Sequence, residues 1–292
     1  MRLINSPINQ FDYKQHTFYV KRDDLLDPQF SGNKARKLAY YLENSLPHID
    51  TLVSYGGSQS NLMYSLSCLA KLKQWNFIYY IKTLSTQAKS ETSGNLAYSL
   101  QNGMQLIELK NDYNSFCDNL ADTIKSNQLL IKQGGAQIEA EYGIQQLAHE
   151  IRAWAQQQNF QQLAIFIASG TGTSALYLQK HLPEFEVYTT NCVGSPEYLL
   201  KQFSELITTT QKIPTLLANN TYRFANPNAE LYKIISDIKN TSQIEFDMVY
   251  DPIAWNILLN HLNKISSPIL YIHCGGTIGN TTMLKRYKKI LS

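Results

Sequence analysis

The sequence predicts an α/β protein with largely parallel sheets, because short apolar strands alternate with amphipathic helices along its 292 residues. Apolar runs rich in Val, Ile, Tyr and Phe and bounded by Gly, Ser, Asn or Pro are typical of strands buried in a parallel sheet. The chain is also longer than one hydrophobic core usually grows, so we expect two lobes. The predicted strands are TLVSY from Thr51, FIYYI from Phe77, MQLIEL from Met104, LAIFIA from Leu163, EVYTTNCV from Glu186 and PILYIHC from Pro268.

Helical periodicity is clearest between residues 138 and 158. Apolar side chains recur there at spacings of three and four and form one face, made by Ile144, Leu147, Ile151 and Trp154. Another helix is predicted to begin near Lys34, in the segment KARKLAYYL. The sequence contains no internal repeat and no low-complexity segment, so the alternation of strand and helix describes most of the chain.

The composition predicts a folded enzyme rather than a nucleic-acid or membrane protein. Hydrophobic residues make up 43% and charged residues 17% of the chain, and the net charge is only +3. The one basic run, LKRYKK at residues 284 to 289, is typical of the exposed last turn of a C-terminal helix. No apolar run reaches the roughly 20 residues that span a bilayer, and the N-terminal stretch is too polar for a signal peptide.

The cysteines indicate a reducing, cytoplasmic setting. They are far apart and form no CxxC pair, at Cys68, Cys117, Cys192 and Cys274. The histidines form no HExxH pattern, so no zinc site is expected.

Polar residues concentrate at four junctions, three of which follow predicted strands. Ligands of parallel α/β proteins bind beyond the carboxyl ends of the strands, so these junctions are the candidate site. They are SGNK (31–34), YGGSQSN (55–61), ASGTGTS (168–174) and HCGGTIGN (273–280).

The ASGTGTS junction is a candidate phosphate-binding loop. Gly170 and Gly172 let the backbone amides point inward, and a helix follows. No lysine follows as in GxxxxGK[ST], and the third glycine of GxGxxG is absent, so a single phosphate fits better than a dinucleotide. The alternative is a tight turn capped by Ser and Thr.

The YGGSQSN junction carries hydrogen-bonding groups at the start of a helix. Open amides, hydroxyls and amide side chains suit a carboxylate or a ring with heteroatoms. The alternative is that Ser58 merely caps the helix. The motif is not GxSxG, so a nucleophile-elbow hydrolase finds no support.

Lys34 follows the SGN turn directly and could therefore point into a cleft rather than into solvent, where most lysines lie. Burial disfavours the charged amine and lowers its pKa, so the free amine can attack a carbonyl. A carbonyl cofactor with one phosphate is pyridoxal 5'-phosphate.

Taken in order, VKRDDLLDPQFSGNKARKL, SYGGSQSN and SGTGTSALY resemble the fold-type II pyridoxal-phosphate enzymes. The chain is most similar to the branch of 1-aminocyclopropane-1-carboxylate deaminase and D-cysteine desulfhydrase. The resemblance implies a two-domain, tryptophan synthase β-like fold with the cofactor in the cleft, and a homodimer. We expect a large cofactor-binding domain at residues 1–37 and 131–292 and a small domain at 38–130.

The resemblance also implies roles for individual residues. Lys34 would form the Schiff base with the cofactor, Asn61 would bond its ring hydroxyl, and Cys274 would stand at the pyridine nitrogen. The substrate would face Ser58, Gln59 and Ser60, with Ser60 near its carboxylate or reacting carbon. The phosphate would be held by Lys37, Gly170, Thr171, Gly172 and Thr173.

Two departures from the family concern aromatic hydroxyls. The family often has a tyrosine, sometimes followed by a glutamate, just after an Asp-Pro pair, whereas Asp251-Pro252 is followed here by Ile253, Ala254 and Trp255. A second active-site tyrosine has Phe224 as its nearest counterpart. Both hydroxyls are therefore expected to be absent, and we expect no opening of the cyclopropane ring.

The predicted function is a pyridoxal-phosphate-dependent lyase or deaminase that carries out β-elimination on a small amino acid, like D-cysteine desulfhydrase. Lys34 would move the α-proton and a group such as thiolate would leave. Two alternatives stay open: an isomerase or β-replacement enzyme on the same fold, and a cofactor-binding protein without turnover.

Overall fold

The computed structural model describes residues 3–30, 32–207 and 210–291. Ser31 of the SGNK junction lies outside the described residues, as does the side chain of Gln87. The predicted α/β class with mostly parallel sheets is confirmed, since all strand pairs but one are parallel in the part described.

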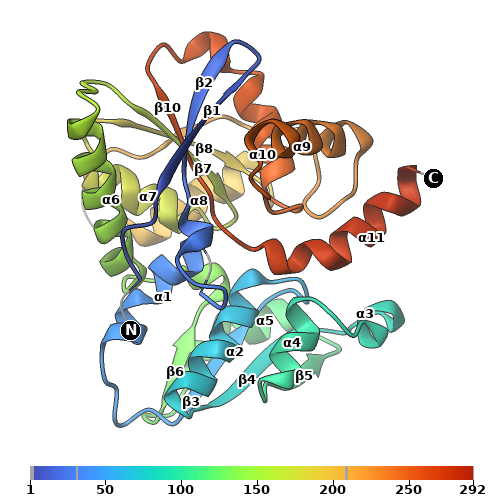
Figure 1. Cartoon of the computed structure of the whole chain (residues 1–292). Helices are drawn as coiled ribbons and strands as arrows, with labels where there is room; N and C mark the ends of the chain where they lie inside the picture. Colours follow the sequence, from blue (N-terminus) through green and yellow to red (C-terminus); the bar gives the residue numbers. More distant parts are fainter. Residues whose placement is uncertain (1–2, 31, 208–209, 292) are drawn as a thin grey trace.

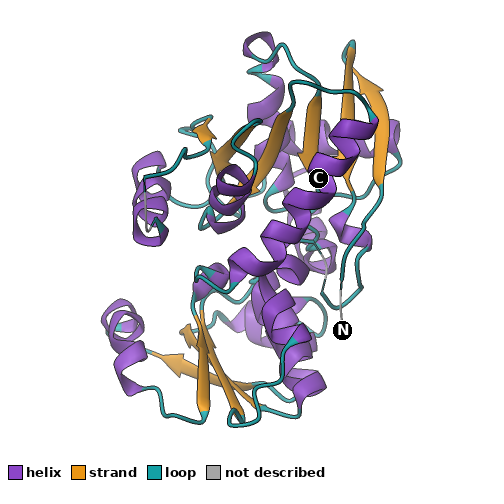
Figure 2. Cartoon of the chain, turned by 90° about the vertical axis from the view of Figure 1, so that its left-hand side faces the viewer, coloured by secondary structure: helices purple, strands orange, loops and turns teal. Residues whose placement is uncertain are grey.

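The strands form two sheets that lie in separate halves of the molecule (Figure 1, Figure 2). The six-stranded sheet has the order β1-β2-β10-β7-β8-β9. Its strands are β1 (Ile8–Tyr13), β2 (His16–Lys21), β7 (Ala164–Ser169), β8 (Glu186–Asn191), β9 (Thr215–Leu216) and β10 (Ile269–Ile272). The four-stranded sheet has the order β5-β4-β3-β6 and comprises β3 (Thr51–Tyr55), β4 (Asn76–Lys82), β5 (Gln105–Leu109) and β6 (Gln128–Ile131).

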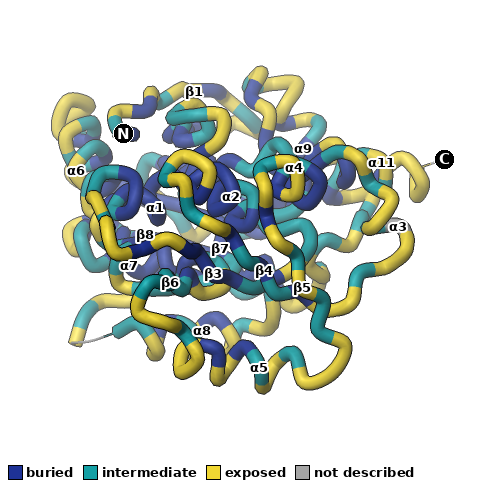
Figure 3. The backbone as a smooth tube through the Cα atoms, turned by 90° about the horizontal axis from the view of Figure 1, so that it is seen from below, coloured by how far each residue is buried: buried dark blue, intermediate teal, exposed yellow. Residues whose placement is uncertain are grey.

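The helices cover these sheets, and the most deeply buried segments run through the middle of the molecule, where β3 and β7 lie (Figure 3). Around the four-stranded sheet lie α2 (Asn61–Lys73), α3 (Thr86–Ser90), α4 (Asn95–Gln101) and α5 (Tyr113–Asn119). The other helices are α1 (Asn33–Glu43), α6 (Ala140–Gln157), α7 (Thr173–His181), α8 (Pro196–Leu206), α9 (Ala229–Ser242), α10 (Asp251–Leu259) and α11 (Asn280–Leu291).

Each of the six predicted strands is present, and the helix predicted from residue 138 is α6. The sequence did not indicate β1, β2, β6 and β9. β1 and β2 form an antiparallel hairpin whose polar residues give only a weak alternation, and β9 is two residues long. The division of the strands into two separate sheets supports the expectation of two lobes. The domain boundaries at residues 37/38 and 130/131 stay a prediction.

A buried ion network fixes α1 against α6 and the start of the chain. The Arg36 guanidinium bonds both carboxylate oxygens of Asp23, at 2.8 and 2.9 Å, and both of Glu150, at 2.7 and 2.9 Å. Lys21 Nζ adds a 2.6 Å contact to Glu150. Arg36 and Asp23 are fully buried, so their charges depend on each other in a medium that screens poorly. The network holds the helix that carries Lys34 and Lys37.

Replacing Arg36 by Met should lower the free energy of unfolding by about 3–5 kcal/mol, because Asp23 and Glu150 are left as buried charges without their main partner. The same change at Arg152, whose pair with Glu184 is about a third exposed, should cost less than about 1 kcal/mol. Urea unfolding of both variants measures the difference. Equal losses would show that the Arg36 network does not anchor α1.

Candidate active site

A cavity of about 370 Å³ lies between the two sheets, at the carboxyl ends of their parallel strands. It is lined by residues that follow β3, β6, β7 and β10 and by the first turn of α1. The predicted site residues that line it are Lys34, Lys37, Ser58, Gln59, Ser60, Asn61, Gly170, Thr171 and Cys274. Gly172 and Thr173 lie behind this wall, at the start of α7. Residues from all four polar junctions thus line one cavity, while the roles of these residues stay predictions.

Lys34 enters the cavity because the turn before it packs on the end of β10. Gly32 has φ +64°, and a Cβ there would lie 1.9 Å from the carbonyl oxygen of Cys274, so glycine is required. The amide of Asn33 donates to the same carbonyl at 3.2 Å. Burial lowers the pKa of Lys34, and its interaction with the ionisable groups of Cys274, Asp247 and Asp251 opposes this only in part. Lys34 is therefore closer to a free amine than an exposed lysine.

Lys37 lies one turn further along α1 and also lines the cavity. Its side chain is buried, and its Nζ donates to the carbonyl of Gly134 at 2.7 Å. No acidic side chain forms an ion pair with it in the described ranges. Burial, followed by repulsion from Lys34, lowers the pKa of Lys37 to about 7. A buried cation without an anion is a site that a phosphate would complete.

The loop at residues 170–172 lies next to Gly134, the residue to which Lys37 donates. It leads into the N-terminus of α7, which no described side chain caps. The hydroxyls of Thr171 and Thr173 are 3.0 Å apart, and the buried hydroxyl of Ser174 has no hydrogen-bond partner among the residues that the structure describes. Gly134 closes this end from the other lobe, since a Cβ there would be 2.6 Å from Thr171. Open helix amides beside Lys37 fit the single phosphate of pyridoxal phosphate.

Asn61 is oriented by two partners on opposite sides. Its Oδ1 accepts from Asn95 at 2.7 Å, and its Nδ2 donates to Asp247 at 3.4 Å. Gly276 lies against it, because a Cβ on that glycine would be 2.2 Å from Asn61 Nδ2. The amide is therefore held in one orientation at the cavity wall.

Ser60, not Ser58, caps α2. Its Oγ accepts from the amide of Met63 at 3.3 Å. The alternative that Ser58 caps the helix is therefore wrong. Gln59 lines the cavity, but its Oε1 accepts from Thr282 of α11 at 3.1 Å. The polar loop is thus held both by its own helix and by the C-terminal helix.

No phenol follows the Asp-Pro pair, but one reaches the cavity from Tyr250, the residue before that pair. Ala254 and Trp255 are fully buried in the core, whereas Tyr250 and Asp251 line the cavity. The reason is a turn made by Asp247, whose Oδ1 accepts from the amides of residues 249 and 250 at 2.8 and 2.6 Å. This turn brings Tyr250 and the first residue of α10 to the cavity, and residues one turn later face the core. Asp247 in the segment DMVYD was the signal in the sequence.

Phe224, the nearest counterpart of the second tyrosine, lines the cavity. Its ring meets that of Tyr250 edge to face, with centroids 4.9 Å apart. The cavity wall thus has a phenyl ring at Phe224 and a phenol at Tyr250, which sequence reasoning had not singled out. Burial raises the pKa of Tyr250 well above its usual range, so the phenol keeps its proton.

Two further carboxyl groups, Asp247 and Asp251, lie at the cavity wall. Burial raises the pKa of both, and repulsion from Asp247 raises that of Asp251 further. Cys274 lies beside them, and burial followed by the charge of Asp251 raises the pKa of its thiol to about 12. Its Sγ donates to the carbonyl of Ile272 at 3.6 Å. A neutral thiol and a carboxyl are thus both candidates for the ring nitrogen.

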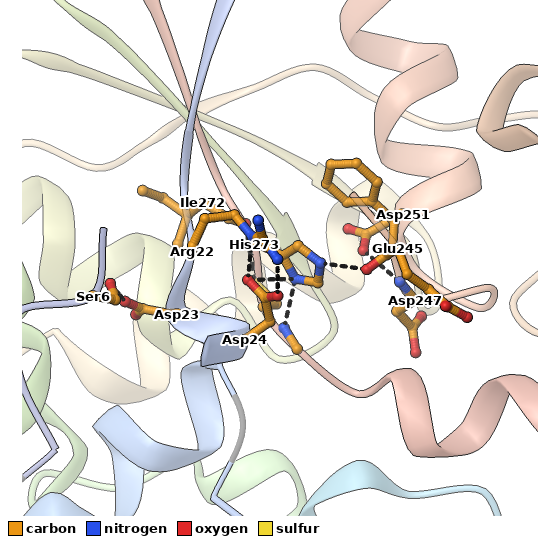
Figure 4. Close-up of polar contacts among 12 residues, drawn as sticks. Ser6, Arg22, Asp23, Asp24, Glu245, Asp247, Asp251, Ile272 and His273 are labelled. Carbon is orange, nitrogen blue, oxygen red and sulfur yellow. Dashed lines mark hydrogen bonds and ion pairs between the residues drawn. The ribbon is translucent and has the colours of Figure 1, made fainter. Parts of the chain in front are cut away.

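His273 holds the turn that follows β10 (Figure 4). The amide of Gly275 donates to its Nδ1 at 3.0 Å, so Nε2 carries the proton and donates to the carbonyl of Glu245 at 2.8 Å. Burial lowers the pKa of His273, and its ring stacks on Phe246 at 4.7 Å. The neutral ring therefore joins the HCGG turn to the segment that leads to Asp247.

Sequence reasoning also missed Gln133 and Gly134, which line the cavity after β6. The signal was the pair of glycines in IKQGG, both of which have positive φ, +70° and +69°. Because β6 is a four-residue strand that was not predicted, this junction was not recognised.

Lys37 predicts a pH dependence of the protein without cofactor. Its folded pKa of about 7 lies below the unfolded value near 10.4, so between these values the unfolded state binds more protons. Stability should then rise with pH over this window, by up to about 1.4 kcal/mol per pH unit. Thermal and urea unfolding between pH 7 and 9.5 measures the slope. Lys37→Met should flatten it, and a variant with the wild-type slope would contradict the assignment.

No family model matches this sequence. A Thermotoga maritima protein provisionally named 1-aminocyclopropane-1-carboxylate deaminase is 25% identical over 286 residues, which cover 89% of each chain. The D-cysteine desulfhydrase of Serratia proteamaculans is 26% identical over 290 residues, 91% of this chain and 88% of its own. The solved structure of an ACC deaminase homologue superposes with a TM-score of 0.78 at 22% identity, over 98% of this chain and 95% of that one.

No helix among the described residues is long and apolar enough to span a membrane. The comparisons confirm the resemblance that the three motifs indicate, over about nine tenths of the chain. The chain has the fold of the fold-type II pyridoxal-phosphate enzymes and is related to proteins named 1-aminocyclopropane-1-carboxylate deaminase and D-cysteine desulfhydrase.

Proposed function

We propose that this protein is a pyridoxal-phosphate-dependent lyase or deaminase that carries out β-elimination on a small amino acid. The observation that carries the proposal is the placement of Lys34 and Lys37 in one cavity, with Lys37 beside the open N-terminus of α7. A relative named D-cysteine desulfhydrase, similar over nine tenths of the chain, supports this reaction class. The proposed substrate is therefore a small thiol or hydroxy amino acid.

The chain offers a complete set of groups to hold the cofactor. Lys34 would bind it covalently, Asn61 would face its ring hydroxyl, and Cys274 or Asp251 its ring nitrogen. The phosphate would lie between Lys37 and the start of α7, where Gly170, Thr171, Gly172 and Thr173 are found. When bound, the cofactor supplies an electron sink that stabilises negative charge at the substrate α-carbon.

The remaining steps belong to side chains of the chain. The Lys34 amine, freed by the substrate and kept uncharged by burial, would take the α-proton. Ser58, Gln59 and Ser60 would bind the substrate carboxylate through hydroxyls and open amides. Tyr250, whose phenol keeps its proton, would donate to a departing group that leaves poorly as an anion.

Other parts of the prediction belong to the same proposal. The resemblance supports a homodimer and a division into a large domain, 1–37 with 131–292, and a small domain, 38–130. The unpaired cysteines support a cytoplasmic setting. An isomerase or β-replacement enzyme could use the same Lys34 and cofactor site. A cofactor-binding protein without turnover would share the site but release no keto acid.

Opening of the cyclopropane ring is a second candidate reaction. The observation that favours it is the pair Tyr250 and Asp251 at the cavity wall, which supplies the phenol and carboxyl that the sequence seemed to lack. A relative named as the corresponding deaminase is 25% identical. The expectation that the ring is not opened stays a prediction, and the cyclopropane substrate is included in the assay below.

Borohydride reduction of the purified protein with pyridoxal phosphate should attach the cofactor to Lys34, because burial lowers the pKa of its amine and Lys37 is bonded to the carbonyl of Gly134. Peptide mapping identifies the labelled residue. Lys34→Ala should leave the peptide unlabelled, while Lys37→Met should weaken binding without moving the label. A label on Lys37, or none, would refute the cofactor assignment.

Keto-acid release from D-cysteine, L-cysteine, D-serine and the cyclopropane substrate tests the reaction class. Tyr250→Phe should lower D-serine turnover by about 100-fold or more but D-cysteine turnover by less than about tenfold, because thiolate leaves without a proton and hydroxide does not. Tyr198→Phe, at the same cavity, is the matched control and should change neither. Equal losses on serine and cysteine would contradict the role of Tyr250. If none of the four substrates releases a keto acid, the result would favour a protein that binds the cofactor without turnover.

A further inference from the structure

Asp251 is held from behind by a residue that does not line the cavity. The phenol of Tyr271, on β10, donates to Asp251 Oδ1 at 2.5 Å. The other carboxyl oxygen accepts from the amide of Asp247 at 2.9 Å. Both oxygens therefore have a fixed partner in the core, and the carboxyl has one orientation at the cavity wall.

Tyr271 itself has little freedom to move. Its ring stacks on Trp255 with centroids 4.3 Å apart and planes at 9°, and on Phe166 at 5.7 Å. Phe246 meets it edge to face at 5.8 Å. The ring is fully buried, so the hydroxyl is the one polar group that it contributes to this part of the core. A packed ring of this kind fixes where the hydrogen bond points.

The charge of Asp251 depends on a balance between its neighbours. Burial and Asp247 favour the neutral carboxyl, as does the more distant Asp24, and the hydrogen bond from Tyr271 favours the ionised form. The other titratable groups that face it are Lys34, Cys192 and Cys274. The amide of Asp247 also favours the ionised form, but Tyr271 is the side chain that donates to the carboxyl, so removal of its hydroxyl changes the balance without adding a charge.

We propose that Tyr271 is a positioning residue that orients the Asp251 carboxyl toward the cavity and favours its ionised form there. The inference rests on the proposed function, since the cofactor or substrate would be the group that Asp251 faces. Tyr271→Phe is the informative variant, because it removes the hydroxyl and keeps the stacked ring. The matched control is Tyr41→Phe, a buried tyrosine whose hydroxyl accepts from Gln137 at 2.5 Å, remote from Asp251.

The first test needs no cofactor. Unfolding of wild type, Tyr271→Phe, Asp251→Asn and the double variant, each measured across pH, gives the coupling between the two side chains. Without the hydrogen bond from Tyr271, the carboxyl of Asp251 has a higher pKa in the folded state, because that bond favours the ionised form. The loss in the free energy of unfolding caused by Tyr271→Phe should therefore grow as pH rises through the titration of Asp251. We expect an increase of roughly tenfold in the unfolding equilibrium constant, absent on the Asn background. A cost that is independent of pH, or unchanged by Asp251→Asn, would overturn the proposal.

The second test uses the protein loaded with pyridoxal phosphate. The pH at which the absorbance of the bound cofactor changes should move up by roughly one to two units in Tyr271→Phe and stay in place in Tyr41→Phe. An unmoved profile in Tyr271→Phe, with a changed one in Asp251→Asn, would refute a role of Tyr271 at the site. If wild type fails to bind the cofactor, the proposed function is wrong, and the coupling measured without cofactor still decides whether Tyr271 acts on Asp251.

Discussion

The constraint on which the site depends is the placement of two lysines, one half-buried and one buried, on neighbouring turns of one helix. Lys34 and Lys37 both lose solvation in the cavity, and the second has no acidic partner among the residues described. Such a helix needs an external anchor, which Arg36 provides through Asp23 and Glu150. Helix α1 thus carries two lysines whose pKa values are lowered, Lys34 and Lys37, and one arginine, Arg36, whose charge is paired with two carboxylates. A phosphate at Lys37 would remove part of this cost.

Much of the fold was predictable because the strands of a parallel sheet are buried on both faces and appear as continuous apolar runs. β3, β7 and β10 are of this kind, and each is where the sequence places it. The hairpin β1–β2 and the short β6 were not predictable, since their polar residues and length give no clear period. The polar junctions could be named from sequence because glycine, serine and asparagine cluster there for geometric reasons.

The part of the site that sequence reasoning misplaced lies where a side chain redirects the backbone. The Asp-Pro pair at residues 251 and 252 drew attention to Ala254 and Trp255, but Asp247 forms the turn that selects Tyr250 and Asp251. Contacts that come from distant segments, such as Tyr271 on Asp251 or Asn95 on Asn61, leave no pattern along the chain. These tertiary contacts decide which polar groups reach the cavity and how they are charged.

The most direct test of the central claim is a crystal structure of the protein grown with pyridoxal phosphate. We predict continuous density from Lys34 Nζ to the cofactor, with the phosphate between Lys37 and the N-terminus of α7 and the ring hydroxyl at Asn61. A cofactor whose phosphate lies away from Lys37, or a cavity in which Lys34 carries no added density, would contradict the account.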